Sequence, residues 1–348
     1  EQDIKFLIHS ELLSDQNNFI SGMKLDNGMV QFAHDFSIAT FSKLEKIFAG
    51  QINGTSNNIG SGIIGGKDYV GMSKDSGISF DIGKLPAGHR KDIEICIYID
   101  ENKKTMHDFM DEVERIRKID FNKELNDTKA YWRKYVKEHD GLKIKEPQNS
   151  YEEKILNVYK RSILLFPLLM NEETGGIIAS PEVDEELSQC GRYAYCWPRD
   201  AVFITQALDI LKMNKEADKF YSEFCRITQS KNGMWEQRFY TDGRLAPCWG
   251  YQVDETASVV YGVYNHYEYT KNEEFLKENL HMCELAITFL KKYVYDVLEN
   301  TGKYSVSYDI WEENDRGIHM YSLASIFSAF DTMKKIYKAL GKNVSDFE

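Results

Sequence analysis

Tryptophans and carboxylates recur together in polar segments of the second half of the chain. Trp197 is followed by Arg199 and Asp200, and Trp311 is followed by Glu312 and Glu313. An indole ring beside acids and an arginine suits a ligand that has both an apolar face and many hydroxyls, as a pyranose ring has. The pattern therefore indicates a carbohydrate site, with filling of the core as the alternative for any single tryptophan.

Two further tryptophans, Trp235 and Trp249, lie in similar segments, and the second is followed by Asp254 and Glu255. Adjacent carboxylates point in different directions, so each acidic pair could divide catalysis and hydrogen bonding between its members. Asp254 has an alternative interpretation as the N-cap of the next helix, with Glu255 in the first turn of that helix.

Glu312 stands apart from the other acids. A loop carboxyl beside an indole is partly desolvated, which favours the neutral, proton-donating form that a general acid needs. The alternative is a solvated loop acid without a catalytic role. Asp309 and Asp315, on either side, could be turn or cap residues.

Other catalytic chemistries find no support in the sequence. The eight histidines show no metal-ligand spacing, and no G-x-S-x-G segment or Ser-His-Asp order stands out. The six cysteines are irregularly spaced without a CxxC pair, which favours buried free thiols in a reducing compartment. Residues 60–65 fit G-x-G-x-x-G, but strand-like residues follow where a dinucleotide site needs a helix. We expect no metal and no cofactor.

Charge and hydropathy limit the partners. The 348-residue chain has 43 Lys and Arg against 55 Asp and Glu, a formal net charge of −12. Such a surface repels phosphates, so we expect no nucleic-acid partner. The longest apolar stretch, around residues 163–170, is too short to cross a membrane, so we expect a soluble protein without a membrane partner.

The first hundred residues predict β-strands, because apolar residues alternate there with a period of two. The alternating runs are residues 4–8, 32–38, 78–82 and 93–99, with turns at 26–28 and 86–88. No crossover helices intervene, so we expect a partial antiparallel β-sandwich over residues 1–104. Dense charge without Gly or Pro over residues 105–139 predicts one or two helices, in a linker that extends to residue 149.

After Pro147 the apolar period changes to three or four residues, which predicts helices packed on one face. The expected helices lie near residues 155–170, 201–211, 217–227, 253–269, 280–294 and 320–340. Strands followed by helices, rather than alternating with them, indicate a multidomain β + α chain with a helical domain over residues 150–348.

Several segments, in the same order, resemble bacterial members of glycoside hydrolase family fifteen, the glucoamylase and glucodextranase family. They are residues 174–181, 196–201, 242–243, 249–257 and 308–313. The resemblance covers about Asp127 to the end and, more weakly, the strand region. It implies a β-sandwich, a helical linker and an (α/α)6 toroid. It also implies an inverting, exo-acting hydrolase that releases glucose from the non-reducing ends of malto- or isomalto-oligosaccharides.

The resemblance further implies roles for residues of this chain. Glu312 would be the general acid, and Glu313 would hydrogen-bond the sugar beside it. Arg199 and Asp200 would grip the hydroxyls of the terminal glucose. Asp309 would support the acid loop, Asp254 and Glu255 would be structural, and the subsite walls would be Trp197, Trp249 and Trp311.

Inversion also requires a general base about 6.5–9.5 Å from the acid, so that a water fits between them. The resemblance places this base beyond Glu348 and implies twelve toroid helices, where about six are expected here. We therefore expect an internal fragment with the first half of the toroid, inactive alone and with an exposed apolar edge that promotes association. Residues 235–238 stand where many relatives carry Pro-Gln-Asn, which leaves the linkage preference open.

Two other functions stay open at this point. One is an inverting disaccharide phosphorylase, which uses one Glu and takes phosphate as the nucleophile. The other is a carbohydrate-binding protein without catalysis. The expected partner is an oligosaccharide substrate, and the sequence predicts no oligomeric state. The unpatterned cysteines favour a cytoplasmic protein, with secretion as the alternative because the chain starts at Glu1.

Overall fold

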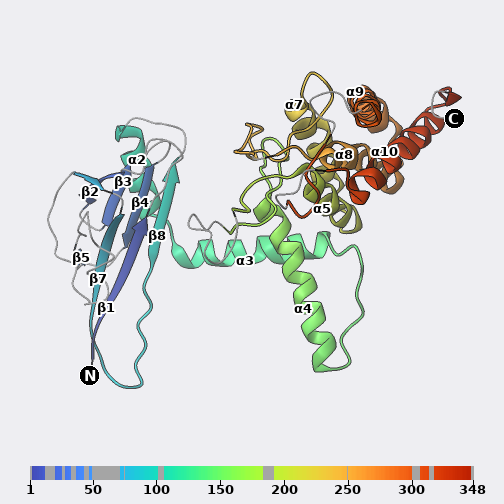
Figure 1. Ribbon diagram of the computed structural model, residues 1–348. Coiled ribbons are helices and arrows are strands. Elements are labelled where there is room, and N and C mark those ends of the chain that lie inside the picture. The colour runs from blue at the N-terminus through green and yellow to red at the C-terminus, as the bar shows by residue number, and fades with distance from the viewer. Residues whose placement is uncertain are drawn as a thin grey trace. The chain divides into compact units, whose positions relative to one another are not determined.

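The computed structural model consists of two compact units, Glu1–Lys129 and Ala130–Glu348 (Figure 1). The boundary lies inside helix α3 (Phe121–Glu138), within the range expected to be a linker. The structure describes residues 2–11, 20–25, 28–32, 37–42, 47–48, 71–73, 75–100, 106–182, 192–248, 250–299, 306–312 and 317–345.

The first unit contains two antiparallel sheets among its described residues. A three-stranded sheet has the order β1 (Gln2–Glu11), β7 (Asp75–Leu85), β5 (Ile47–Phe48). A five-stranded sheet has the order β6 (Gly71–Ser73), β2 (Ile20–Leu25), β3 (Gly28–Phe32), β4 (Ser37–Ser42), β8 (Ile95–Asp100). The prediction of one strand over residues 32–38 is wrong, because β3 ends at Phe32 and β4 starts at Ser37 and pairs back against it.

Strand β3 contributes side chains to both faces of the five-stranded sheet. Met29 packs with Phe80 of the three-stranded sheet, whereas Val30 packs with Phe109 of helix α2 (Met106–Arg117). This division follows from the pleat, since successive side chains of a strand point to opposite faces. The apolar residues of the first unit thus form two small cores, one between the sheets and one beneath α2.

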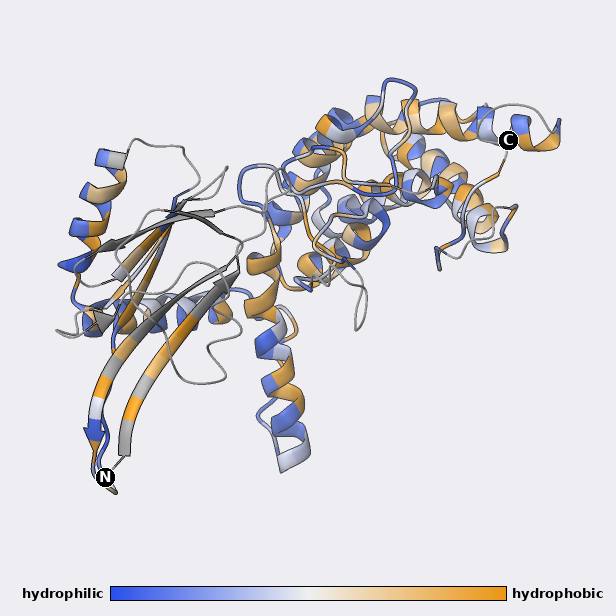
Figure 2. Cartoon of the chain, turned by 60° about the vertical axis from the view of Figure 1, so that its left-hand side comes forward, coloured by the Kyte–Doolittle hydropathy of each residue, from blue (hydrophilic) through white to orange (hydrophobic). Residues whose placement is uncertain are grey.

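The second unit is helical, as the apolar periodicity predicts, and its core centres on α8 (Figure 1). Helix α8 packs against α5, α9 and α10. Along these helices hydrophobic and hydrophilic residues alternate in bands, which is typical of helices with one buried face (Figure 2). The elements are α4 (Ser150–Leu165), η1 (Phe166–Leu169), α5 (Pro198–Ile210), α6 (Asn214–Lys219), the π-helical turn η2 (Phe220–Cys225), α7 (Arg226–Thr228), α8 (Val253–Thr270), α9 (Glu273–Leu298) and α10 (Met320–Ala339).

Candidate active site

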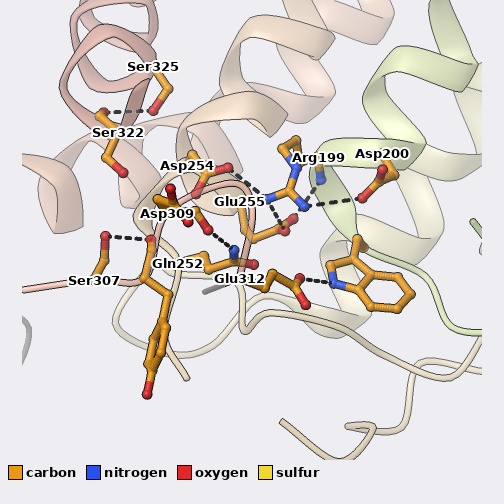
Figure 3. A network of polar contacts seen from close by, with 12 residues as sticks. Arg199, Asp200, Gln252, Asp254, Glu255, Ser307, Asp309, Glu312, Ser322 and Ser325 are labelled. Atoms are coloured by element: carbon orange, nitrogen blue, oxygen red, sulfur yellow. Dashed lines mark hydrogen bonds and ion pairs between the residues drawn. The ribbon is translucent and has the colours of Figure 1, made fainter. Parts of the chain in front are cut away.

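The first turns of α5 and α8 meet through a buried charge cluster (Figure 3). Arg199, in the first turn of α5, places its Nη1 atom 2.9 Å from Asp254 Oδ2 and 3.0 Å from Glu255 Oε1. Its backbone N–H also donates to Glu255 Oε2 at 2.7 Å. Both carboxylates are fully buried in the first turn of α8, so the cluster fixes the starts of the two helices relative to each other.

Three carboxyl groups share this one guanidinium, because Asp200 Oδ2 also lies 3.4 Å from Arg199 Nη2. Burial opposes the charge on Arg199, yet Glu255, Asp254 and Asp200 hold its pKa above the ordinary value. Burial raises the pKa of Glu255 well above its usual range and also raises that of Asp200. The cluster carries an excess of acid, and its half-exposed member, Asp200, is the one that a ligand can reach.

The interpretation of Asp254 as an N-cap is wrong. Helix α8 begins at Val253, its N-cap is Gln252, and the Gln252 side chain makes no capping hydrogen bond. The Asp254 side chain faces Arg199 instead of the helix N-terminus. A buried guanidinium needs an ionic partner more than the helix end needs a cap, which explains why the residue is placed inside the first turn.

The Gln252 side chain instead supports the loop that carries the candidate acid. Its Nε2 donates to the backbone carbonyl of Asp309, and the backbone N–H of Tyr308 donates to the carbonyl of Tyr251 at 2.9 Å. Asp309 is a turn residue, since its Oδ1 accepts the backbone N–H of Trp311 at 3.0 Å. The segment 308–312 is therefore held against the start of α8 by backbone and side-chain contacts.

Glu312 closes this loop in the left-handed region, with φ of 57°. Few residues other than glycine adopt this conformation, and where it persists the surroundings over-determine it, often at functional sites. The Trp197 indole N–H donates to Glu312 Oε1 at 2.7 Å, although the two residues are 115 positions apart (Figure 3). The fold thus brings together two of the residues that the sequence analysis selected.

Trp197 is itself held by neighbours that the sequence analysis did not assign to the site. The nearly buried guanidinium of Arg238 lies 5.3 Å from the centre of the Trp197 ring and 4.8 Å from that of Tyr195. Arg238 Nε donates to the carbonyl of Pro247 at 2.6 Å, which fixes the cation over the two rings. The only sequence signal for Arg238 is its place in the segment 235–238, which departs from the sequence that the family resemblance leads one to expect.

The remaining predicted site residues fall into three groups. Trp311 presents a ring that is 79% exposed beside Glu312, so it is available as a subsite wall. Trp235 is fully buried in the helical core and donates to the carbonyl of Cys225 at 3.0 Å, so the core interpretation applies to it. Trp249 and Glu313, with Asp315, lie outside the described residues.

Among the described residues, no group of three or more His, Cys, Asp or Glu side chains is arranged to hold a metal ion. Across the same residues, no helix combines the length and apolar character that a membrane span requires.

Comparison with known proteins assigns the helical unit to a protein family. Residues 153–346 match the family described as glycosyl hydrolases family 15. An uncharacterized glycosyl hydrolase from Methanocaldococcus jannaschii is 26% identical over 280 residues, which cover 79% of this chain and 42% of that protein. A trehalase from Mycolicibacterium smegmatis is 25% identical over 173 residues, covering 46% of this chain and 25% of the trehalase. The chain thus spans less than half the length of these relatives.

A bacterial glucoamylase solved in complex with acarbose has a similar structure. It superposes with a TM-score of 0.69 at 15% sequence identity, over 94% of this chain and 46% of the glucoamylase. At this identity the likeness shows the fold alone. The expectation of an α/α toroid, preceded by antiparallel β-structure, is confirmed at that level.

Proposed function

Because the chain belongs to the glycosyl hydrolases of family 15, we propose that it carries the acid side of the active site of an inverting, exo-acting α-glucoside hydrolase. The substrates would be malto- or isomalto-oligosaccharides, from whose non-reducing ends glucose is released. The observation that carries the proposal is the hydrogen bond from Trp197 Nε1 to Glu312 Oε1. This bond fixes the orientation of a loop carboxyl whose backbone is in the strained left-handed region.

In this mechanism Glu312 donates its proton to the glycosidic oxygen as the bond from that oxygen to the anomeric carbon breaks. A water attacks the anomeric carbon from the opposite face, so an α-glucoside yields β-glucose. The proton lost by Glu312 leaves on the new hydroxyl of the departing sugar. The water gives its proton to a second carboxylate, the general base. After the products leave, the base releases this proton to solvent and Glu312 takes one up from solvent, which resets both groups for the next turnover.

The other residues would bind the sugar. Asp200, half-exposed and held from behind by Arg199, would accept hydrogen bonds from hydroxyls of the terminal glucose. Arg199 is almost fully enclosed by carboxylates, so it would act on the sugar mainly by fixing Asp200. The exposed ring of Trp311 and the ring of Trp197 would form subsite walls, together with Trp249, and Glu313 would hydrogen-bond the sugar.

The stereochemistry of the product tests the reaction. The full-length protein is incubated with maltotriose, isomaltotriose or trehalose, with and without phosphate, and the anomeric protons are followed by NMR. We expect β-glucose as the first product, without a need for phosphate. Trehalose is included because one relative is a trehalase. β-Glucose 1-phosphate would indicate a phosphorylase instead, α-glucose a retaining enzyme, and no product a binding protein.

The acid is tested by Glu312→Gln, which keeps the size of the side chain and its ability to accept the Trp197 N–H. Loss of the proton donor lowers the rate by about 10²–10⁴-fold in enzymes of this kind. Glu274→Gln is the matched control, because Glu274 is 73% exposed on α9, outside the site. Equal rates for the wild type and Glu312→Gln would refute the assignment of the acid.

A further inference from the structure

Helix α3 carries three aromatic side chains that line a cavity in the second unit. Tyr131, Trp132 and Tyr135 form one wall of a space of about 400 Å³. This volume falls in the range of about 300–1,000 Å³ typical of small-molecule sites. Trp132 is also the one tryptophan that lies outside the segments between the toroid helices, so the proposed catalytic site gives it no role.

Trp132 meets both tyrosine rings edge to face. The ring centroids of Tyr131 and Trp132 are 5.1 Å apart with the planes at 80°, and those of Trp132 and Tyr135 are 5.5 Å apart at 72°. Tyr131 stays 59% exposed, although burial of such a ring is favourable. Exposed aromatic rings gathered at a concave surface are typical of a binding site rather than of a core.

The rest of the lining is apolar at Pro167 and Met170 and otherwise polar, without a net charge. Its charged members are Glu172 after η1 and Lys215, Glu216 and Lys219 from α6, two acids and two lysines. The Lys219 ammonium donates to the backbone carbonyl of Glu172. Donors and acceptors of balanced charge in a cavity lined by aromatic rings suit a neutral ligand with many hydroxyls better than a phosphate or a carboxylate.

Tyr135 contributes a neutral hydroxyl to the aromatic wall. Burial, together with the nearby Glu216 and Tyr131, raises the pKa of Tyr135 to about 12. The phenol stays protonated at all pH values near neutrality, and its hydroxyl lies 3.9 Å from the sulfur of Met213. This contact anchors α3 to the helical core, so the wall is part of the second unit.

The cavity is distinct from the candidate active site but connected to it by one segment. None of its lining residues belongs to the clusters around Arg199 or Glu312. Asn171 in its wall begins the stretch that leads to Ala179, whose backbone N–H donates to the carbonyl of Tyr195 at 2.9 Å. Tyr195 in turn packs against Trp197.

We propose that this cavity is a second saccharide-binding site, which holds a segment of an α-glucan through Tyr131, Trp132 and Tyr135. The sugar rings would lie against the aromatic wall, and their hydroxyls would exchange hydrogen bonds with the lysines and glutamates of the lining. The choice of an α-glucan among neutral saccharides rests on the proposed function. Such a site keeps a long substrate on the protein between successive releases of glucose.

Binding is measured first, in the full-length protein with Glu312→Gln so that substrate persists. Isothermal titration calorimetry with maltoheptaose is expected to show two sites. Adding Trp132→Ala is expected to abolish one of them or weaken it at least tenfold. Tyr151→Ala is the matched control, because Tyr151 is an exposed aromatic on α4 that does not line the cavity, and it is expected to change nothing.

Activity is measured in the protein with Glu312 intact. Trp132→Ala is expected to leave kcat/KM for maltotriose within about twofold of the wild type and to raise KM for soluble starch several-fold. If Trp132→Ala unfolds at a lower temperature than the wild type, Tyr131→Ala takes its place, because it truncates a more exposed ring. The proposal would be overturned if calorimetry still shows two maltoheptaose sites in both variants. It would also be overturned if Tyr151→Ala weakens binding as much as they do.

The two proposals fail separately. If the protein releases glucose but binds maltoheptaose at one site only, the second site is refuted and the proposed function stands. If no glucoside is hydrolysed but binding depends on Trp132, the cavity is a saccharide site and the proposed function is refuted.

Discussion

At the scale of single residues, Arg238 is expected to influence the proposed acid through Trp197. Its cation lies over the Trp197 ring, whose N–H bonds to Glu312. A desolvated cation–π contact contributes up to about 2 kcal/mol. If Arg238→Met lets the indole move, the proton donor is misplaced. We expect kcat for maltotriose to fall about tenfold, a change of about 1.4 kcal/mol in the barrier, with KM nearly unchanged.

The choice of substrate separates positioning from general damage. α-Glucosyl fluoride has a leaving group that needs no proton, so Arg238→Met is expected to hydrolyse it at nearly the wild-type rate. Arg244→Met is the matched control, since Arg244 also lies over an aromatic ring, 5.0 Å from the centre of Tyr240, but is exposed. Equal losses on both substrates would show that Arg238 is merely structural.

At the scale of elements, the acid loop depends on a close approach at Gly250. A β-carbon there would lie 2.2 Å from two ring atoms of Tyr308, four residues before Glu312. Gly250→Ala must therefore push the Tyr308 ring and the start of the loop away from α8. We expect kcat to fall at least tenfold, because small misplacements of a catalytic group cost up to about 10²-fold.

Gly317→Ala is the control for this change. Gly317 bridges Ser307 in the same loop, and among the residues that the structure describes its β-carbon would meet only the His319 ring, at 3.6 Å. Steady-state kinetics and thermal unfolding of both variants are compared. A Gly250→Ala protein with wild-type kcat would contradict the idea that the contact of Tyr308 with the backbone places Glu312.

The elements themselves follow from local sequence, whereas their contacts do not. The apolar spacing of three and four predicts α5, α8 and α10 within three residues at each end, because one face of each is buried. It misses the first turns of α4 and α9, and it merges α6, η2 and α7 into one helix. The short strands β2, β5 and β6 are not predicted from the period-two alternation that indicates other strands. Nor does any spacing reveal that Asp254 pairs with Arg199, since the two are 55 residues apart and meet only through packing of α5 on α8.

Residues chosen from segments that resemble a family meet in the structure, whereas residue type alone also selected a core residue. Trp197 and Glu312 lie in segments that match a family, and the structure places them in contact. Trp235 was grouped with them because it also lies outside a helix, yet its ring fills the core. Composition cannot distinguish the two cases, because a loop that returns to the core carries the same polar residues as one that faces a ligand.

At the scale of the whole molecule, α10 leaves an apolar face uncovered among the described residues. Met320, Leu323 and Phe327 are spaced by three and four, so they share one face, and they are 80%, 41% and 74% exposed. Adjacent apolar side chains on such a face favour association. We expect the 348-residue chain to self-associate as its concentration rises, which multi-angle light scattering after size-exclusion chromatography measures directly.

Phe327→Glu places a charge in the middle of that face and is expected to shift the association to at least tenfold higher concentration. The charge must be desolvated if the face is covered by a second copy, which makes the associated state costly. Leu245→Glu is the matched control, because Leu245 is an exposed apolar residue of the hairpin 239–245 and lies on a different element. If Leu245→Glu and Phe327→Glu act alike, net charge rather than the α10 face controls association. If the unsubstituted chain stays monomeric at every concentration, its exposed apolar residues are too few to drive pairing.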